Sequence, residues 1–164
     1  MTSTSNSRVS FSSLTSNNVG TVRKLNSVLF PIKYTDKFYQ GILNPQVENF
    51  CKLVYYNDVP VGTICCRIEQ KDGEDHLYLM TMGILAPYRS RGLGSQSLQS
   101  VLDAASSHTS PRVTKIYLHV QVSNAEAKKF YERHGFKEVG IHKDYYRKIT
   151  PHDAWILEKT IEHK

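Results

Sequence analysis

A strand-like run that leads through a short basic loop into a helix constrains the fold more than any other segment of this chain. The run HLYLMTMGIL (76–85) is largely apolar, and apolar side chains recur three or four positions apart over 94–107, as in an amphipathic helix. Two arginines and two glycines lie just before that helix, in RSRGLG (89–94). The first turn of a helix has unpaired N–H groups and the positive end of the helix dipole, and glycine lets an anion approach them closely. The segment therefore predicts a phosphate-binding turn.

The loop matches neither of two common phosphate-binding motifs. No Lys-Ser or Lys-Thr pair follows Gly94, as a Walker A loop requires, and Ser97 stands where the dinucleotide fingerprint has Gly or Ala. From the motif alone, a basic and flexible surface loop without a ligand remains an open alternative.

The N-terminal part of the chain predicts one strand followed by two helices. Alternation of apolar and polar residues over 8–14 indicates the strand. Apolar residues three or four apart indicate an amphipathic helix over 19–30, with Thr15 or Ser16 as its N-cap and an end set by the proline that follows. A short second helix is expected over 35–43.

Strand-like runs and two more helices make up the rest of the chain. The second of these helices lies in SNAEAKKFYERHGF (123–136), where Ser123 and Glu126 form an expected capping box and Gly135 an expected stop. The expected strands cover 50–56, 60–70, 76–85, 113–122, 137–141 and 154–161. The order βααβββαβαββ predicts an α/β fold with a mixed, mainly antiparallel sheet flanked by helices.

The composition is that of one globular domain that favours anionic partners. The chain has 164 residues, of which 40% are apolar and 22% charged, and this is enough for a single core. We expect residues 8–164 to form the domain and residues 1–7 to form a disordered N-terminal tail. The formal net charge of +6 favours nucleic acid, a phosphorylated cofactor or an acidic protein surface as a partner.

Patterns of membrane spans, secretory signals and metal sites are missing from the sequence. No run approaches the roughly 18 apolar residues of a membrane span, and the N-terminus lacks the apolar core of a secretory signal. The cysteines Cys51, Cys65 and Cys66 are odd in number and form no C-x-x-C pair. We therefore expect buried, reduced thiols and no metal, rather than a disulfide framework or a zinc site.

The loop and its neighbouring segments resemble one family of acetyltransferases. Arg89-Ser-Arg-Gly92-Leu-Gly94 is similar to the R-x-x-G-x-G/A signature with which the GNAT acyltransferase superfamily holds the pyrophosphate of acetyl-CoA. The segments LYLMTMGILAPYRSRGLG, IYLHVQVSNAEAKKFYERHGF and LNSVLFPIKYTDKFY resemble N-terminal protein acetyltransferases of the NatE catalytic-subunit type. The resemblance covers about residues 8–162 and implies the GNAT fold. One departure is Ser90, where the family pattern has a second basic residue beside Arg89.

Two polar residues in the expected sheet are the candidate catalytic pair. The resemblance implies that Tyr78 and His119, on strands expected to be adjacent, take the proton of the substrate amine through an ordered water. Without the resemblance, a core aromatic and a hydrogen-bonded core histidine would explain the two residues. An α-amino group has a pKa of roughly 8 against roughly 10.4 for lysine, so an N-terminal amine needs only modest help from a base.

The resemblance assigns a further group of residues to acetyl-CoA, the expected cosubstrate. Backbone N–H groups near Met82 and Ile84 are expected to hold the acetyl carbonyl and pantetheine where the fourth strand parts from the fifth, and Gly83 permits such an opening. Tyr131 is expected to meet the thiolate and Asn124 to touch the cofactor, with helix-face packing and a helix cap as the alternatives. The expected cofactor-binding residues are Met82, Ile84, Arg89, Ser90, Arg91, Gly92, Leu93, Gly94, Ser95, Asn124 and Tyr131.

Two expected loops carry the candidates for substrate selection. FPIKY (30–34) and DYYRKI (144–149) are rich in aromatic and apolar residues, which exposed loops carry in such numbers mainly where they bind something. The resemblance implies a narrow slot for an N-terminal methionine and the apolar residue after it, with packing of the loops on each other as the alternative. The expected substrate-binding residues are Phe30, Pro31, Ile32, Tyr34, Met80, Tyr145, Tyr146 and Ile149.

Taken with the resemblance, these features predict an Nα-acetyltransferase that moves acetyl directly from acetyl-CoA to protein N-termini starting with methionine and an apolar residue. A lysine acetyltransferase of the same fold is the alternative, although a tight slot would exclude an internal lysine. A nucleic-acid binder lacks any RRM, zinc or helix-turn-helix pattern, and Tyr78 and His119 argue against an inactive adaptor. The resemblance also implies, as partners, auxiliary and catalytic subunits of the NatA complex at the ribosome, and a location in the cytoplasm and the nucleus.

Overall fold

The computed structural model describes residues 8–164, and its helices and strands follow the order expected from the sequence. The tail predicted for residues 1–7 lies outside the described residues. The strands are β1 (Val9–Ser13), β2 (Lys52–Tyr56), β3 (Val59–Lys71), β4 (Glu74–Ile84), β5 (Val113–Gln121), β6 (Lys137–His142) and β7 (Ala154–Thr160). The helices are α1 (Val19–Leu29), α2 (Asp36–Gly41), α3 (Leu93–Ser107) and α4 (Ala125–Arg133), with short 3-10 turns at Pro45–Val47 and Ala86–Tyr88.

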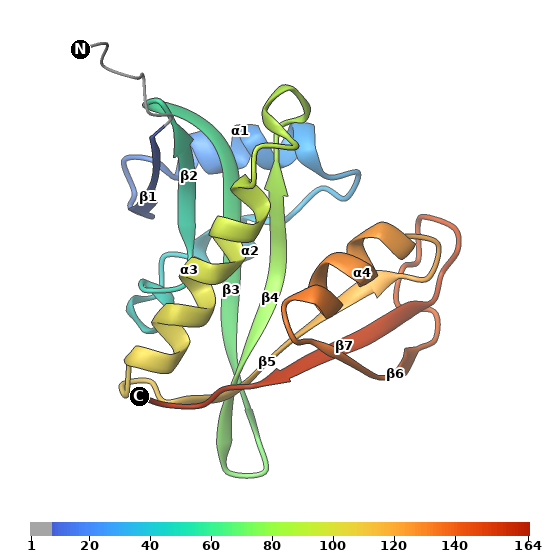
Figure 1. Cartoon of the computed structure of the whole chain (residues 1–164). Helices are drawn as coiled ribbons and strands as arrows, with labels where there is room; N and C mark the ends of the chain where they lie inside the picture. Colours follow the sequence, from blue (N-terminus) through green and yellow to red (C-terminus); the bar gives the residue numbers. More distant parts are fainter. Residues whose placement is uncertain (1–7) are drawn as a thin grey trace, which may run out of the picture.

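The seven strands form one sheet in the order β1-β2-β3-β4-β5-β7-β6. Only β4 and β5 run parallel, and the other neighbouring pairs are antiparallel, which confirms the predicted mixed and mainly antiparallel sheet. Helices α3 and α4 cover one face of the sheet, and α1 and α2 lie on the other (Figure 1). Helix α3 follows β4 and helix α4 follows β5, so the helices after both central strands lie on the same side of the sheet.

Strands β4 and β5 separate halfway along the sheet, and the candidate site lies at this opening. Their pairing runs only from Asp75 opposite Val113 to Tyr78 opposite Tyr117. Beyond that point β4 continues to Ile84 beside β3 alone, and the two strands diverge visibly (Figure 1). A β-bulge at the level of Cys65 and Cys66 of β3 bends β4 in the same region. The locally open ladder predicted around Gly83 is therefore present.

Apolar side chains from the sheet and from the inner faces of the helices form the core. The apolar face expected for α3 is buried, and its buried residues include Leu98, Val101, Leu102 and Ala105. The three cysteines are free and fully buried, as predicted. None of the helices in residues 8–164 is both long and apolar enough to cross a membrane.

Two predicted helix caps were wrong by a few residues. The N-cap of α1 is Asn18, because the Thr15 hydroxyl accepts from the Asn17 N–H and is used in the turn that precedes the helix. The N-cap of α4 is Asn124, whose side-chain oxygen accepts from the Ala127 N–H at 3.2 Å, in place of the expected pair of Ser123 and Glu126. The cap shifts because the Asn124 N–H first closes a turn onto Gln121, and Ser123 lies within that turn. The predicted stop at Gly135 is confirmed by its φ of +91°.

Candidate active site

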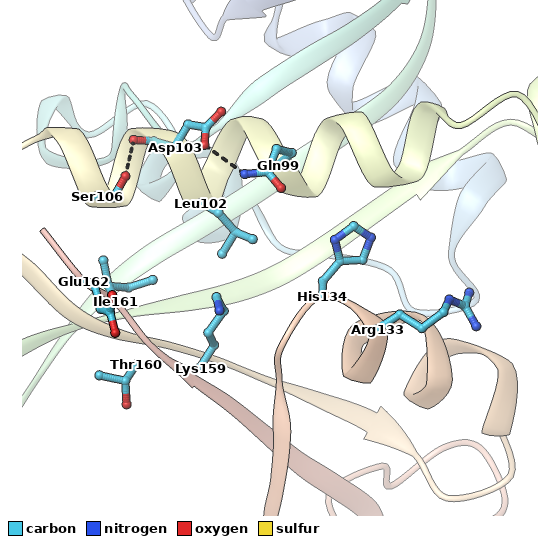
Figure 2. A pocket seen from close by; sticks show the side chains of 10 residues that line it. All are labelled: Gln99, Leu102, Asp103, Ser106, Arg133, His134, Lys159, Thr160, Ile161 and Glu162. Carbon is cyan, nitrogen blue, oxygen red and sulfur yellow. Dashed lines mark hydrogen bonds between the residues drawn. The ribbon is translucent and has the colours of Figure 1, made fainter. Parts of the chain in front are cut away.

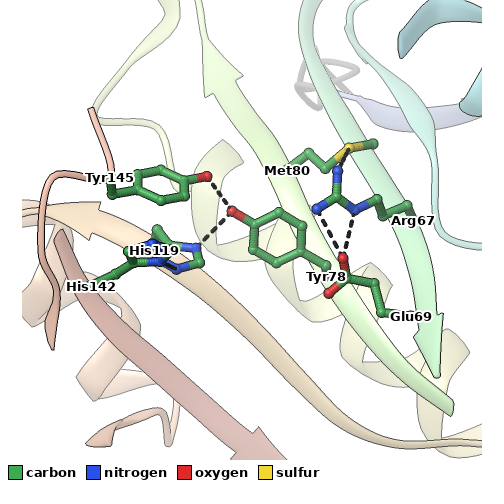
Figure 3. Close-up of polar contacts among 7 residues, drawn as sticks. All are labelled: Arg67, Glu69, Tyr78, Met80, His119, His142 and Tyr145. Carbon is green, nitrogen blue, oxygen red and sulfur yellow. Dashed lines mark hydrogen bonds and ion pairs between the residues drawn. The ribbon is translucent and has the colours of Figure 1, made fainter. Parts of the chain in front are cut away.

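Tyr78 and His119 meet where β4 and β5 begin to separate. Tyr78 is the last residue of β4 that pairs with β5, and His119 lies two positions beyond its partner Tyr117. The Tyr78 hydroxyl is 2.7 Å from His119 Nδ1 (Figure 3). The two side chains, which were expected on adjacent strands, hydrogen-bond directly to each other.

Tyr145 completes this cluster from the loop between β6 and β7. Its hydroxyl lies 2.5 Å from the Tyr78 hydroxyl, and its ring stacks on the His119 ring with centroids 4.0 Å apart and an interplanar angle of 9°. The sequence analysis placed Tyr145 in the substrate slot. In the structure it also contacts both members of the candidate catalytic pair.

Arg67 and Glu69 of β3 border the cluster and were missed by the sequence analysis. The Arg67 guanidinium lies over the Tyr78 ring, 4.8 Å from its centroid, and one of its nitrogens is 4.0 Å from the Met80 sulfur. Arg67 is also ion-paired to Glu69 at 2.9 Å (Figure 3). A charged residue at the end of the apolar run of β3 was the signal that could have identified it.

Burial dominates the protonation behaviour of the pair. It raises the pKa of Tyr78, an effect that Tyr145 reinforces and the positive charge of Arg67 opposes. It also lowers the pKa of His119 to about 4, with further lowering by His142, Arg67 and Lys71. At neutral pH both side chains are therefore uncharged, and His119 has a ring nitrogen available to accept a proton.

The basic loop before α3 has the conformation of an anion-binding turn. Ser90 and Gly92 both have positive φ values, +64° and +77°, and Gly92 is the N-cap of α3. Turns of this kind direct successive N–H groups toward one side and bind anions. A Cβ on Gly94 would lie 3.6 Å from the Phe130 ring, which is an ordinary contact. The fold therefore leaves room for a small side chain at position 94.

The arginines of the loop also make internal contacts. Arg89 donates from Nε to the Ile84 carbonyl at 2.9 Å, which ties the loop to the end of β4. The Arg91 guanidinium lies 5.4 Å from the centroid of the Tyr56 ring. The Leu93 side chain is buried in the core.

A polar cleft opens beside this loop, between α3, the end of α4 and β7. It has a volume of about 520 Å³ and includes His134, whose Nε2 is 3.2 Å from the Ser95 hydroxyl of the cofactor loop. Figure 2 shows the cleft, with the side chain of His134 pointing from the end of α4 toward α3. Neither Tyr78 nor His119 lines it. The cleft adjoins the predicted cofactor loop but lies away from the candidate catalytic pair.

The other predicted cofactor residues surround the opening between β4 and β5. Met82 and Ile84 lie on the part of β4 that has no β5 partner. Tyr131 packs against Phe136 on the inner face of α4, and burial raises the pKa of its phenol. Asn124 caps α4, as its structural alternative predicted, so its side-chain oxygen is engaged by the helix.

The two predicted substrate loops converge near the cluster. Phe30 packs so closely over β4 that a Cβ on Gly83 would lie 2.9 Å from its ring. Tyr34 stands edge-on to Phe30, and its pKa is raised to about 12 by burial and then by Tyr145 of the other loop. Tyr146 packs edge-on against Tyr145 with ring centroids 4.8 Å apart. The structure therefore brings aromatic residues of both loops together.

The remaining substrate candidates are placed less uniformly. Ile149 is half-buried, and Pro31 is exposed. Ile32 lines a cleft of about 440 Å³ that it forms with α1, together with Lys33 and Tyr39. Tyr34 lines the same cleft.

His142, at the end of β6, is a third residue that the sequence did not single out. Its Nδ1 lies 3.2 Å from His119 Nε2, so His119 is contacted through both of its ring nitrogens. A lone histidine near a strand end gives no signal in a sequence. Among residues 8–164, no group of histidine, cysteine or acidic side chains is arranged to hold a metal.

Comparisons with known proteins show what this chain is similar to. The chain matches the family model described as the acetyltransferase (GNAT) family over residues 20–136. It is 40% identical over 154 residues to N-alpha-acetyltransferase 50 of Danio rerio, which covers 94% of this chain and 89% of that relative. The structure of Arabidopsis thaliana Naa50 in complex with the bisubstrate analogue CoA-Ac-MVNAL matches with a TM-score of 0.83 and 42% identity, covering 92% of this chain and 97% of that one. Arabidopsis thaliana NAA60 in complex with acetyl-CoA shares the fold, with a TM-score of 0.78 at 19% identity over 94% of this chain and 100% of that one.

Proposed function

The chain belongs to the GNAT acetyltransferase family, and from this premise we infer that it transfers acetyl from acetyl-CoA to the α-amines of protein N-termini. It is an acyltransferase, and acetyl-CoA is its cosubstrate. We propose further that it prefers N-termini in which methionine is followed by an apolar residue. The peptide part of the analogue bound to the Arabidopsis relative, MVNAL, begins in this way.

The hydrogen-bonded pair of Tyr78 and His119 is the observation that carries the proposal. An amine must lose a proton to attack a thioester, and a positioned base supplies this step. Because burial raises the pKa of the Tyr78 phenol, a free tyrosinate is unfavourable at neutral pH. The phenol can take a proton only as it passes its own to His119 Nδ1, which lies 2.7 Å away. The two residues therefore act as one base.

The rest of the site accounts for direct transfer between two bound substrates. The turn at Ser90 and Gly92, with the N-terminus of α3, suits the diphosphate of coenzyme A. The unpaired end of β4 at Met82 and Ile84 offers backbone groups to the pantetheine and the acetyl carbonyl, and Tyr131 is proposed to protonate the thiolate.

No cysteine is placed to carry the acetyl group as a covalent intermediate. Burial raises the pKa of the Cys65 thiol to about 12 and raises that of Cys66 strongly. A thiol that stays protonated is a poor nucleophile. The buried thiols thus favour direct transfer, as does the open strand pair.

Selectivity is proposed to come from the aromatic residues of the two loops. Phe30 and Tyr34 pack edge-on on one loop, Tyr145 and Tyr146 pack edge-on on the other, and Tyr145 raises the pKa of Tyr34. A methionine side chain buried among such rings gains roughly 1.5–3 kcal/mol. An internal lysine is flanked by chain on both sides and would have to bring both flanks between the loops. A free N-terminus brings only one.

A peptide panel tests the proposal directly. Peptides starting with Met-Leu, Met-Val, Met-Lys, Ala and Ser are incubated with acetyl-CoA, and the modified amine is located by fragmentation mass spectrometry. Peptides with a blocked N-terminus and an internal lysine provide the comparison for the lysine alternative. Preferred α-acetylation of Met-Leu and Met-Val supports the proposal. Acetylation confined to the internal lysine would contradict it.

Partners and location follow from family resemblance and are proposed on that ground. We propose that the chain associates with the auxiliary and catalytic subunits of the NatA complex at the ribosome, and that it works in the cytoplasm and the nucleus. Co-purification of a tagged chain with those subunits, together with ribosome sedimentation and cell fractionation, tests both points. A tagged chain that sediments alone in every fraction would refute the partnership.

A further inference from the structure

Four side chains form one hydrogen-bonded line from the candidate site to solvent. Tyr145 and Tyr78 share a contact of 2.5 Å between hydroxyls, and Tyr78 lies 2.7 Å from His119 Nδ1. His119 Nε2 then lies 3.2 Å from Nδ1 of His142, which is exposed. Figure 3 shows the two imidazole rings next to each other on the side of His119 away from Tyr78. The base described above is therefore extended by one further ring.

We propose that His142 is a relay residue, which receives the proton that Tyr78 and His119 remove from the substrate amine and passes it to water. The inference rests on the proposed function and adds a step to it. His142 does not touch the substrate and acts through His119.

The sheet register explains why the two rings meet. His119 on β5 pairs with Ile156 of β7, and His142 on β6 pairs with Ala154 of β7. Ile156 and Ala154 are two residues apart on one strand, so both histidines stand on the same face of the sheet. Their backbones are separated by two strand spacings, about 10 Å, across the sheet and by two residues, about 7 Å, along it. The small and fully buried Ala154 leaves room for the rings to reach each other across β7.

The electrostatic surroundings of His119 favour passing a proton on rather than keeping it. Arg67 and Lys71 on β3 and His142 on β6 all oppose a positive charge on this ring, and burial opposes it more strongly than any of them. With a pKa of about 4, His119 holds a proton at pH 7 in only about one molecule in a thousand. Tyr145 covers one face of the ring by stacking. His142 contacts His119 Nε2, and the proton can leave His119 through this contact.

The proton balance closes without any other reactant. The amine loses a proton to the Tyr78 oxygen while the Tyr78 hydroxyl proton moves to His119 Nδ1. The Nε2 proton of His119 moves to Nδ1 of His142, and the Nε2 proton of His142 moves to water. One proton has then travelled from the amine to solvent, and every side chain is again neutral. Both rings are left in the other tautomer and return to the first by proton exchange with water between turnovers.

The relay is tested with His142→Gln and His142→Ala in the full chain, using a Met-Leu peptide and acetyl-CoA. His108→Gln is the matched control, because His108 lies at the far end of α3 from the cofactor loop. We expect kcat to fall about tenfold in both His142 variants, less than the 10²–10⁴-fold effect of losing a complete base. The Kd for acetyl-CoA and the thermal midpoint should stay at their wild-type values. His108→Gln should keep the wild-type kcat.

Two further measurements separate a relay from mere packing. Added imidazole should restore the rate of His142→Ala in a saturable way, because the free ring can occupy the vacated place. In mixtures of H₂O and D₂O, the rate of the wild type should vary with a curvature that indicates several protons in flight, and His142→Gln should reduce this curvature. A lower rate accompanied by either result supports the relay.

Two outcomes would overturn it. One is a wild-type kcat in both His142 variants, and the other is a lower rate with neither imidazole rescue nor a changed isotope response. If the wild-type chain fails to acetylate any N-terminal peptide, the proposed function itself is refuted, and the relay with it. If the wild type is active and the His142 variants keep its kcat, the relay alone is refuted.

Discussion

Replacing Gly94 with aspartate should separate cofactor binding from folding. Gly94 is the second residue of α3, and its built Cβ would make only ordinary contacts with Phe130, at 3.6 and 3.7 Å. A carboxylate in the first turn of a helix is favoured by the helix dipole by about 0.3–1 kcal/mol, so the cofactor-free variant should be as stable as the wild type or slightly more so. For a chain of this size, this corresponds to a rise in Tm of zero to about 4 °C.

The same carboxylate should weaken acetyl-CoA binding. It would place a negative charge at the helix N-terminus, where a phosphate must come within hydrogen-bonding distance of backbone N–H groups. Losing one hydrogen bond to a charged group costs about 1.5–3 kcal/mol, which is a ten- to hundredfold rise in Kd. Gly92 is a less informative position, because its φ of +77° makes any side chain there strained whether or not a cofactor binds.

Gly20→Asp provides a matched control for this experiment. Gly20 is also the second residue of its helix, α1, and a Cβ there would meet no atom within 4 Å. It should show the same small change in Tm and no change in cofactor affinity. Calorimetric titration gives the Kd, steady-state kinetics at saturating peptide give the KM, and differential scanning calorimetry without cofactor gives the Tm. A Gly94→Asp variant with wild-type Kd would refute the assignment of this loop to the diphosphate.

Three other predictions concern the pair and the slot. Tyr78→Phe should lower kcat by about 10²–10⁴-fold with little effect on the Kd of acetyl-CoA. A double variant with His119→Ala should have a kcat little lower than that of the poorer single variant. If the two losses in kcat instead add, the two residues do not act as a unit. Phe30→Ala should reduce kcat/KM for Met-Leu peptides by about ten- to hundredfold and that for Ala-started peptides by less, and equal losses would count against the slot. Because the pKa of His119 is lowered to about 4, the unfolded chain binds a proton at higher pH than the folded one, so stability should fall as the pH drops from about 6.5 toward about 4. Urea unfolding at pH 7 and pH 4.5 should show a smaller drop for His119→Gln, and an equal drop would refute this account.

Local sequence patterns determined the elements and the cofactor loop. The apolar periodicity of α3 and the strand-like runs of the sheet depend on residues close together in the chain, and these elements appear where the patterns predicted them. The conformation of RSRGLG is also local, since glycine and the start of a helix are sufficient to form an anion-binding turn. The helix caps at Asn18 and Asn124 were missed because several neighbouring Ser, Thr and Asn residues compete for each cap, and the preceding turn selects among them.

The contacts of the candidate pair were decided only by the tertiary structure. Tyr78 and His119 could be singled out through resemblance to a family, but no local pattern placed Tyr145 or Arg67 against them. Tyr78 and Tyr145 are 67 positions apart in the chain and meet through a loop that no periodicity describes. His142 reaches His119 because β7 returns between their two strands with Ala154 at the crossing point. A one-residue change in that register would turn the His142 ring to the other face of the sheet, since side chains alternate along a strand. Register depends on pairing between distant segments, so the structure was needed to show that the two histidines touch.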